Sequence, residues 1–181
     1  GGDAERSRPL TVVVGGTGAA GEFASVGAIA LQPDGRMIIG GEFTKANDID
    51  SASLARLHKD GSIDAGFDTD AKVTGTDPAG AATVGAVTCL AMHNDGRIVV
   101  GGEFTAVHKR LRPGLAQLNG DGSLDTAFGP GLGTTLQNEL GHEELELVSA
   151  VAVQPNGRMI IGGRFASMDG TKTIRIVRLF D

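Results

Sequence analysis

The chain has 181 residues, of which 29 are glycine, with one cysteine, no tryptophan and no tyrosine. Its hydrophobic fraction of 40% suits a single globular domain and is too high for a disordered chain, while the lone Cys89 excludes a disulfide scaffold. The formal net charge of −6 argues against nucleic acid as a partner, because phosphate binding needs a basic surface, and the apolar runs are too short for a membrane span.

The first 25 residues contain charges, then an apolar run, then a glycine-rich stretch. Residues 1–10 lack an apolar core, so we expect no signal peptide in this chain, and the missing initial Met favours a fragment or a mature segment. The stretch Gly16-x-Gly18-x-x-Gly21 follows an apolar run, as in a dinucleotide-binding fingerprint. Later copies of this region lack the glycines but keep the strands that follow. We therefore expect a loop between repeats here and no cofactor site.

From residue 26 onward the sequence repeats with a period of 61. Residues 26–67 and 87–128 are identical at 18 of 42 positions without a gap, which chance does not produce. The third copy stops at Asp181, and the N-terminal residues are in phase with the part that it lacks. The expected organisation is one repeat domain, 1–181, with repeats at approximately 26–86, 87–147 and 148–181, the last completed by 1–25.

Each repeat contains apolar runs separated by turn signals. In the first repeat, the runs 26–31 and 36–40 flank Pro33-Asp34-Gly35, which predicts a tight antiparallel hairpin. A third run covers 54–57, and a weaker fourth strand is expected near 70–75, in phase with Leu10–Val14. Each repeat is therefore predicted to form four antiparallel strands.

The sidedness of these strands predicts how the repeats pack. The first two strands are apolar on both faces, so we expect them to be covered on both sides. The third strand carries Arg56, Gln117 or Arg178 in the three repeats, so we expect it to lie nearer solvent. This pattern predicts an all-β protein made of three four-stranded blades of a β-propeller, with the first strands near the axis. A threefold closed fold of the β-trefoil type is the alternative.

Glycine and phenylalanine recur at positions that we assign to the scaffold. The hairpin glycines would supply a positive φ, the Gly-Gly pairs follow the second strand, and the phenylalanine after each pair would fill the space between blades. These turn and core residues are Gly35, Gly40, Gly41, Phe43, Gly96, Gly101, Gly102, Phe104, Gly157, Gly162, Gly163 and Phe165.

Two segments, LQPDGRMIIGGEFT at 31–44 and LNGDGSLDTAF at 118–128, resemble the delta-60 repeat family, a bacterial β-propeller-like repeat of about this period. The third repeat departs from the pattern at Asn156 and Arg164 and lacks the second motif. The resemblance implies a large secreted or surface-exposed bacterial protein, or a phage structural protein, and therefore an extracellular or surface-associated location. It implies no catalytic residue.

Oxygen-bearing side chains alternate around a glycine after the third strand of the second repeat, in a pattern similar to a calcium loop. The calcium candidates are Asn119, Asp121, Ser123 and Asp125. The first repeat has His58 at the first of these positions, and the bidentate acid that completes a calcium loop is missing. We therefore favour a turn closed by side-chain hydrogen bonds to the backbone, and we expect no other metal and no cofactor.

Other reactive side chains occur without the partners that catalysis needs. A glycosidase pair could be drawn from the acidic stretch before the third repeat, but nothing selects two of its members, and a solvated loop is the favoured interpretation. These acids are Glu139, Glu143, Glu144 and Glu146. Cys89 replaces Ala28 and Ala150 in a core strand, which indicates a small apolar side chain, and the basic cluster 108–112 indicates a solvated loop.

The sequence therefore favours a non-catalytic β-propeller module for protein interaction or assembly within a larger bacterial surface or phage structural protein. The alternative is a propeller enzyme that acts on glycans or lactones through loop carboxylates. The stretches that differ most between repeats, where a partner would bind, include 45–53, 106–114 and 167–175. The expected partner is protein: either further blades or a second copy, since two chains of three blades would make a ring of six.

Overall fold

The computed structural model describes ten segments of the chain, and every regular element in them is a β-strand. The prediction of an all-β protein is confirmed for these segments, and none of them includes a helix that could cross a membrane. The described residues are 10–16, 24–67, 72–76, 79–129, 136–137, 143–144, 147–165, 167–168, 171–172 and 175–179.

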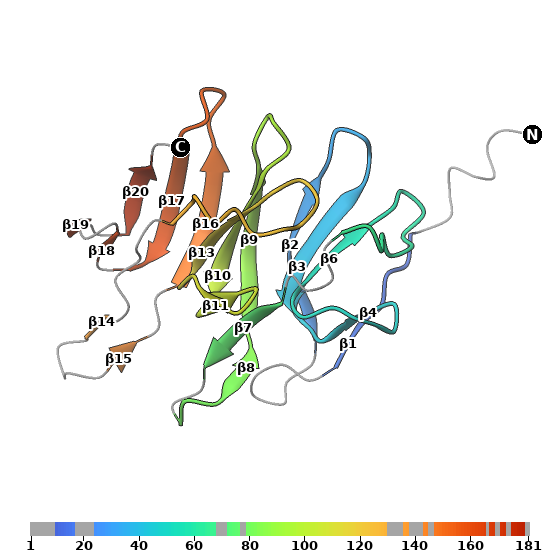
Figure 1. The fold of residues 1–181 in the computed structure, drawn as a ribbon, viewed down its shortest axis with the longest axis horizontal. Coiled ribbons are helices and arrows are strands. Elements are labelled where there is room, and N and C mark those ends of the chain that lie inside the picture. The colour runs from blue at the N-terminus through green and yellow to red at the C-terminus, as the bar shows by residue number, and fades with distance from the viewer. Residues whose placement is uncertain are drawn as a thin grey trace, which may run out of the picture.

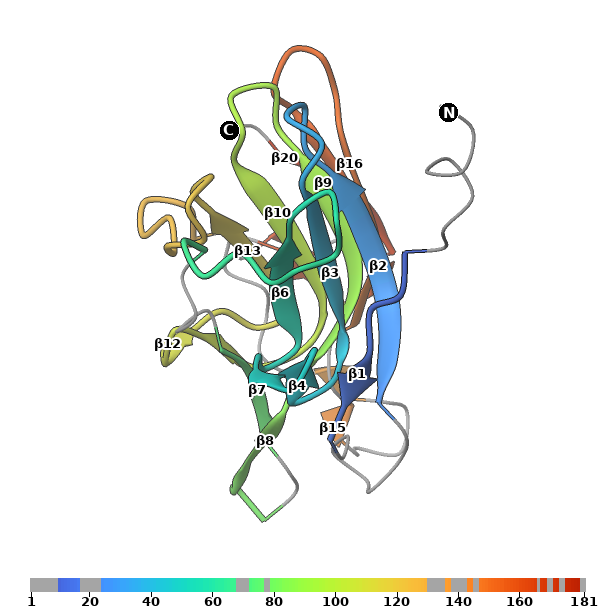
Figure 2. The same ribbon diagram turned by 90° about the vertical axis from the view of Figure 1, so that its right-hand side faces the viewer.

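Three antiparallel sheets of three strands each, one per repeat, stand side by side (Figure 1). In each sheet, which we call a blade, the second strand lies between the first and the third. The first strands β2, β9 and β16 lie along one side of the row, and β6 and β13 lie on the other (Figure 2). The blades consist of β2 (Ser25–Leu31), β3 (Met37–Glu42) and β6 (Leu54–Leu57); β9 (Ala86–Met92), β10 (Ile98–Glu103) and β13 (Leu115–Leu118); and β16 (Leu147–Val153), β17 (Met159–Arg164) and β20 (Ile176–Leu179).

A short hairpin connects the second and third strands of each blade. The segment before each of the first two blades pairs with that hairpin: β1 with β4, and β7 with β11. These smaller strands are β1 (Val14–Gly15), β4 (Lys45–Ala46), β5 (Ile49–Asp50), β7 (Val73–Thr76), β8 (Ala82–Val84), β11 (Ala106–Val107), β12 (Arg110–Leu111), β14 (Leu136–Gln137), β15 (Glu143–Glu144), β18 (Ser167–Met168) and β19 (Thr171–Lys172).

The predicted four-stranded blade is not confirmed. The expected fourth strand exists as β7, but β7 pairs with the hairpin of the next repeat and not with its own blade. In its place, one isolated bridge, Leu57 to Ile63, extends the first blade. After this bridge the Asp64 carboxylate accepts the Gly66 N–H at 2.9 Å. The described sheets form a row and do not close into a ring.

Burial depends on the neighbours of a blade and not on strand order within it. The third strands β6 and β13 are buried at all four positions, including Arg56 and Gln117, so the expectation that they lie nearer solvent is wrong. The first strand β2, expected to be covered on both faces, is exposed along much of one face. The reason is that among the described residues no blade precedes the first one.

Each first strand contains a β-bulge at the same repeat position, occupied by Gly27, Thr88 and Ser149. The bulge crowds the second glycine of the Gly-Gly pair, so that a Cβ on Gly41 would collide with the carbonyl oxygen of Ser25. The first glycine has another role. The space beside Gly40 is filled by Val87 of the next blade. One glycine therefore permits the bulge, and the other permits close approach of two blades.

The phenylalanines that follow the Gly-Gly pairs are all buried. Phe104 and Phe165 belong to apolar clusters that span two blades, as expected for residues between blades. Phe43 instead packs in a cluster of the first blade with Val12 and Val14 of the N-terminal segment. The N-terminal segment thus covers part of the face of the first blade.

Candidate functional site

In the described part of the chain, the same five-residue turn occurs five times at one end of the blades. In each copy the first N–H donates to the fifth carbonyl at 2.7–2.9 Å, and the fourth residue is a glycine with φ between 83° and 94°. An Asp or Asn at the third position accepts the fifth N–H through its side chain. The copies are 32–36, 58–62, 93–97, 119–123 and 154–158. This is the three-residue hairpin loop in which glycine adopts the left-handed conformation.

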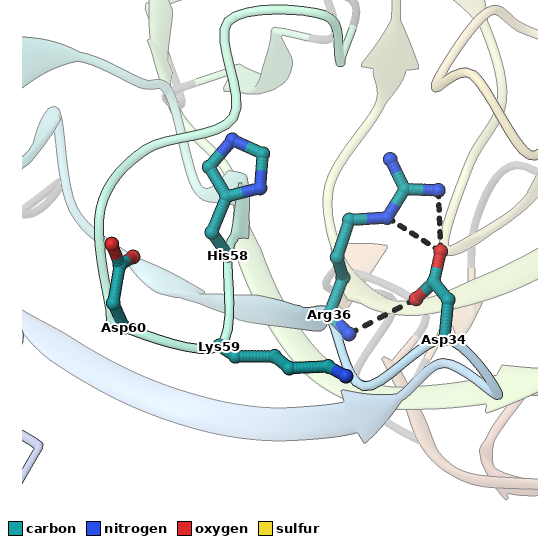
Figure 3. A pocket seen from close by; sticks show the side chains of 5 residues that line it. All are labelled: Asp34, Arg36, His58, Lys59 and Asp60. Carbon is teal, nitrogen blue, oxygen red and sulfur yellow. Dashed lines mark hydrogen bonds and ion pairs between the residues drawn. The ribbon is translucent and has the colours of Figure 1, made fainter.

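A surface pocket of about 420 Å³ lies between the two turns of the first blade (Figure 3). Its walls carry Asp34, Arg36, His58, Lys59 and Asp60. Arg36 donates from its backbone N–H to Asp34 at 3.0 Å and from Nε at 2.7 Å, and these bonds lower the pKa of the Asp34 carboxyl. Hydrogen bonds from Ser62 lower the pKa of Asp60. Both acids are therefore ionised at neutral pH, so neither can donate a proton as a general acid.

Asp64 contacts Arg36 of the pocket and joins the first turn of the blade to its third strand. Its Oδ2 accepts hydrogen bonds from Arg36 Nη1 and Arg56 Nε, each at 2.9 Å. Burial alone would raise the pKa of the Asp64 carboxyl, but the bonds from Arg36, the Gly66 N–H and Arg56 outweigh it and lower that pKa. The Arg56 guanidinium also lies 4.7 Å from the centre of the Phe67 ring.

Arg56 also links two blades, because its Nη1 donates to the carbonyl oxygen of Gly120 at 2.6 Å. Asp64, Arg56 and Gly120 therefore form a continuous polar connection from the first blade to a turn of the second. This arrangement has a clear structural role, because every polar contact in it holds a turn or a junction.

The calcium candidates occupy the equivalent turn of the second blade. Asp121 Oδ1 accepts the Ser123 N–H at 2.9 Å and its hydroxyl at 2.7 Å, and Asn119 Nδ2 donates to Ser123 Oγ at 2.9 Å. Asp125 accepts Gln117 Nε2 at 3.0 Å, a bond that lowers the pKa of its carboxyl. Over the described residues, no group of three or more His, Cys, Asp or Glu side chains is arranged to hold a metal. Calcium binding here stays a prediction.

The family described as a β-propeller domain of unknown function (DUF5122) matches residues 32–67, 93–128 and 154–180, more than half of the chain. The chain belongs to this family. Each match begins at the first turn of a blade and extends through its third strand, so the family unit has the period of the structural repeat but leaves out the first strand of each blade. Membership favours the propeller over the trefoil alternative. No curated protein matches the chain significantly.

The first two hairpins of this DUF5122 chain have the same backbone conformation at the turn and differ in side chains. Residues 47–48 and 108–109 have φ of 45° to 63°, as in a two-residue turn of type I′. The outer strands that follow carry Ile-Asp in β5, Arg-Leu in β12 and Thr-Lys in β19. Ile49 and Leu111 are exposed, at 46% and 66%. The variation between the repeats predicted a binding surface in this region, and the structure adds that the turn has the same backbone conformation in the first two repeats.

The remaining candidates for catalysis are the buried thiol of Cys89 and the acidic stretch before the third repeat. Burial raises the pKa of the Cys89 thiol to about 11, so it is protonated at neutral pH and a poor nucleophile. Of the acidic stretch, Glu143 and Glu144 form the short strand β15, while Glu139 and Glu146 lie outside the described residues.

Proposed function

We propose that this DUF5122 β-propeller chain is a non-catalytic module for protein interaction and assembly. The observation that supports it best is the pair of hairpins β4–β5 and β11–β12, which present different exposed side chains on one backbone design. Fixed scaffolds that carry variable exposed loops are typical of recognition surfaces. Apolar Ile49 and Leu111 at these outer strands suit a protein partner more than a nucleic acid.

The contacts of the acidic turn residues also favour this function. Asp34, Asp60, Asp64, Asp121 and Asp125 all accept hydrogen bonds that hold turns or buried side chains. An enzyme acting on glycans or lactones would need two loop carboxylates, and the side chains of the acidic stretch lie outside the part of the chain that the structure describes. We therefore keep that enzyme as the alternative.

The resemblance to delta-60 repeats supports a place for the module in a larger bacterial surface or phage structural protein. Such proteins contain many copies of a repeat, and the faces of a propeller blade are suited to binding further blades. The proposed partner is accordingly protein, and the proposed location is extracellular or surface-associated.

Replacing Ile49 and Leu111 together by Ser tests the hairpin surface. The wild-type chain, immobilised, should retain a protein from an extract of the source organism, and the double variant should retain it about tenfold less, because truncated apolar anchors dominate such losses. The matched control is Leu10→Ser, at an exposed apolar residue outside the hairpins. Equal retention by wild type and double variant would contradict the proposal, and turnover of a glycan or lactone panel would favour the enzyme.

A further inference from the structure

Among the described residues, the first and the third blade each have one face that is not covered by another blade. These two faces carry the residues that are buried, at equivalent positions, where neighbouring blades pack together. At equivalent positions of the three first strands stand Val26, Val87 and Val148. Val87 and Val148 are 1% and 0% exposed because each packs against the preceding blade, whereas Val26 is 42% exposed. The same residue thus has a partner surface in two repeats and solvent in the first.

The face that a blade turns toward its predecessor carries its larger side chains. In the second blade these include Leu90 and Met92, which pack against a cluster that contains Ile38 of the first blade. Their equivalents in the first blade are Ile29 and Leu31, exposed at 63% and 69%. With Val26, they form what we call the leading face of the chain.

The opposite face, which a blade turns toward its successor, combines small residues with large side chains such as Ile38 and Leu54 of the first blade. A Cβ on Gly40 or Gly101 would collide with the valine of the next blade, but at Gly162 the nearest atoms are 3.8 Å away. Leu54 is 4% exposed, and its equivalent Ile176 is 65% exposed. Gly162, Ile176 and the exposed Ala150 form the trailing face of the chain.

The polar groups of an internal junction are also present on the trailing face. Thr88 Oγ1 donates to the carbonyl oxygen of Val148 in the following blade at 2.5 Å. Ser149 is the equivalent of Thr88, keeps the hydroxyl and is exposed. Arg178 is the equivalent of Arg56, which reaches a carbonyl of the following blade, and it is exposed as well. The trailing face therefore has the space and the polar groups to bind a blade that carries a valine at the position of Val26.

We propose that the leading face of one chain binds the trailing face of a second copy, and that the reciprocal contact closes a six-bladed ring of two chains. Val26 would occupy the space beside Gly162 of the other copy, and Ser149 would donate to the carbonyl oxygen of Val26. The inference rests on the assembly part of the proposed function and does not involve the hairpin surface. Six blades lie within the usual range of propellers.

The internal repeats favour this occupant and this orientation. A closed ring buries both faces of both chains, whereas pairing two leading faces would oppose large side chains and leave both trailing faces in water. The described part of the N-terminal segment, residues 10–16, does not obstruct the contact, because its equivalent β7 stands beside the second blade while the first blade is in place.

The test is the mass of the chain in solution by light scattering, with two variants. Wild type should have twice the monomer mass of 18.4 kDa. Ile29→Asp damages the leading face and Gly162→Val fills the trailing face, so each alone should be monomeric. An equimolar mixture should form a pair again, because the trailing face of the first variant and the leading face of the second are intact. Leu111→Ser, which changes only the hairpin surface, should keep the wild-type mass.

Several outcomes would overturn the ring. They are a monomeric wild type at the highest soluble concentration, a series of open polymers, a Gly162→Val variant that stays dimeric, or a mixture that stays monomeric. Circular dichroism and thermal unfolding identify a variant that fails to fold, and Ile176→Asp then replaces Gly162→Val. Failure of the ring leaves the retention experiment on the hairpins unaffected, so the two proposals can fail separately.

Discussion

The described part of the chain has two junctions between blades, one between the first and second and one between the second and third. The two junctions bury apolar side chains at equivalent repeat positions but differ in their polar groups. At both, a valine of the later blade fills the space beside a glycine of the earlier one. In the first blade the buried partner of the turn aspartate is the charged Arg56, and in the second it is the neutral Gln117. The contact between valine and glycine is thus common to both junctions. The side chain that pairs with the aspartate can be either arginine or glutamine.

The largest expected effect concerns these two aspartates. Asp64→Ala leaves the guanidinium of Arg56, which is 5% exposed, without its carboxylate and should cost about 3–5 kcal/mol of unfolding free energy. Asp125→Ala leaves a neutral amide and should cost about 1–3 kcal/mol. Urea denaturation at neutral pH measures both. Asp50→Ala, at an exposed aspartate, is the control and should change nothing measurable. Equal losses at Asp64 and Asp125 would contradict the distinction between the junctions.

The next effect tests what the junctions share. Val87→Ala and Val148→Ala each remove two methyl groups from a fully buried site and should each cost about 2 kcal/mol. Denaturant midpoints of the two variants should therefore nearly coincide. A much larger loss at one of them would show that the apolar register is not equivalent in the two junctions.

A second substitution separates the junctions again. Gly40→Ala places a Cβ against the Val87 side chain, so Val87→Ala should relieve most of its cost. Gly101→Ala collides with Cys89 as well as with Val148, so Val148→Ala should relieve less. Double-mutant cycles measure both couplings. Identical coupling energies would contradict a contribution of Cys89 to the cost of Gly101→Ala.

Local features could be predicted from the sequence more fully than spatial neighbours. The turns, the period and the first three strands follow from short-range patterns such as Asp34-Gly35, which specify a turn without reference to the rest of the chain. The partner of β7 could not be predicted, because a phase relation does not say which repeat a strand joins. The charge of Arg56 led to the prediction that the third strand is exposed. Its partner Asp64 lies eight residues away and reaches it only because of the intervening turn, so the pair could not be seen in the sequence.

In the candidate site, too, the local features could be predicted and the spatial neighbours could not. The turn interpretation of Asp121 and Ser123 needed only their spacing, and their hydrogen bonds have the expected form. The leading face could not be recognised, because Val26 and Val87 lie in similar apolar runs at equivalent repeat positions. Only the presence or absence of a neighbouring blade distinguishes them.

A smaller effect is the response to acid. The folded protein lowers the pKa of the Asp64 carboxyl, so this group stabilises the fold above its unfolded pKa of about 3.9, and the stabilisation is lost as the pH falls through the lower folded value. The stability difference between wild type and Asp64→Asn should be constant from neutral pH to about pH 4 and should narrow below it. Chemical denaturation across this range measures the difference. A gap that stays constant in stronger acid would contradict the role of the charge.

The smallest effect should be the same in every blade, because the hairpin turn is the same. Gly96 has φ of 92° and nothing within 4 Å of its added Cβ, so Gly96→Ala should cost about 1 kcal/mol through backbone strain alone. At Gly35, with φ of 84°, the new Cβ would also meet the Lys59 side chain, whose flexible end can move aside at little cost. Gly35→Ala should therefore lose nearly as much as Gly96→Ala, and Lys59→Ala should remove the remaining difference. If Gly35→Ala were far more costly than Gly96→Ala even in the presence of Lys59→Ala, the turn of the first blade would carry backbone strain that the turn of the second blade lacks.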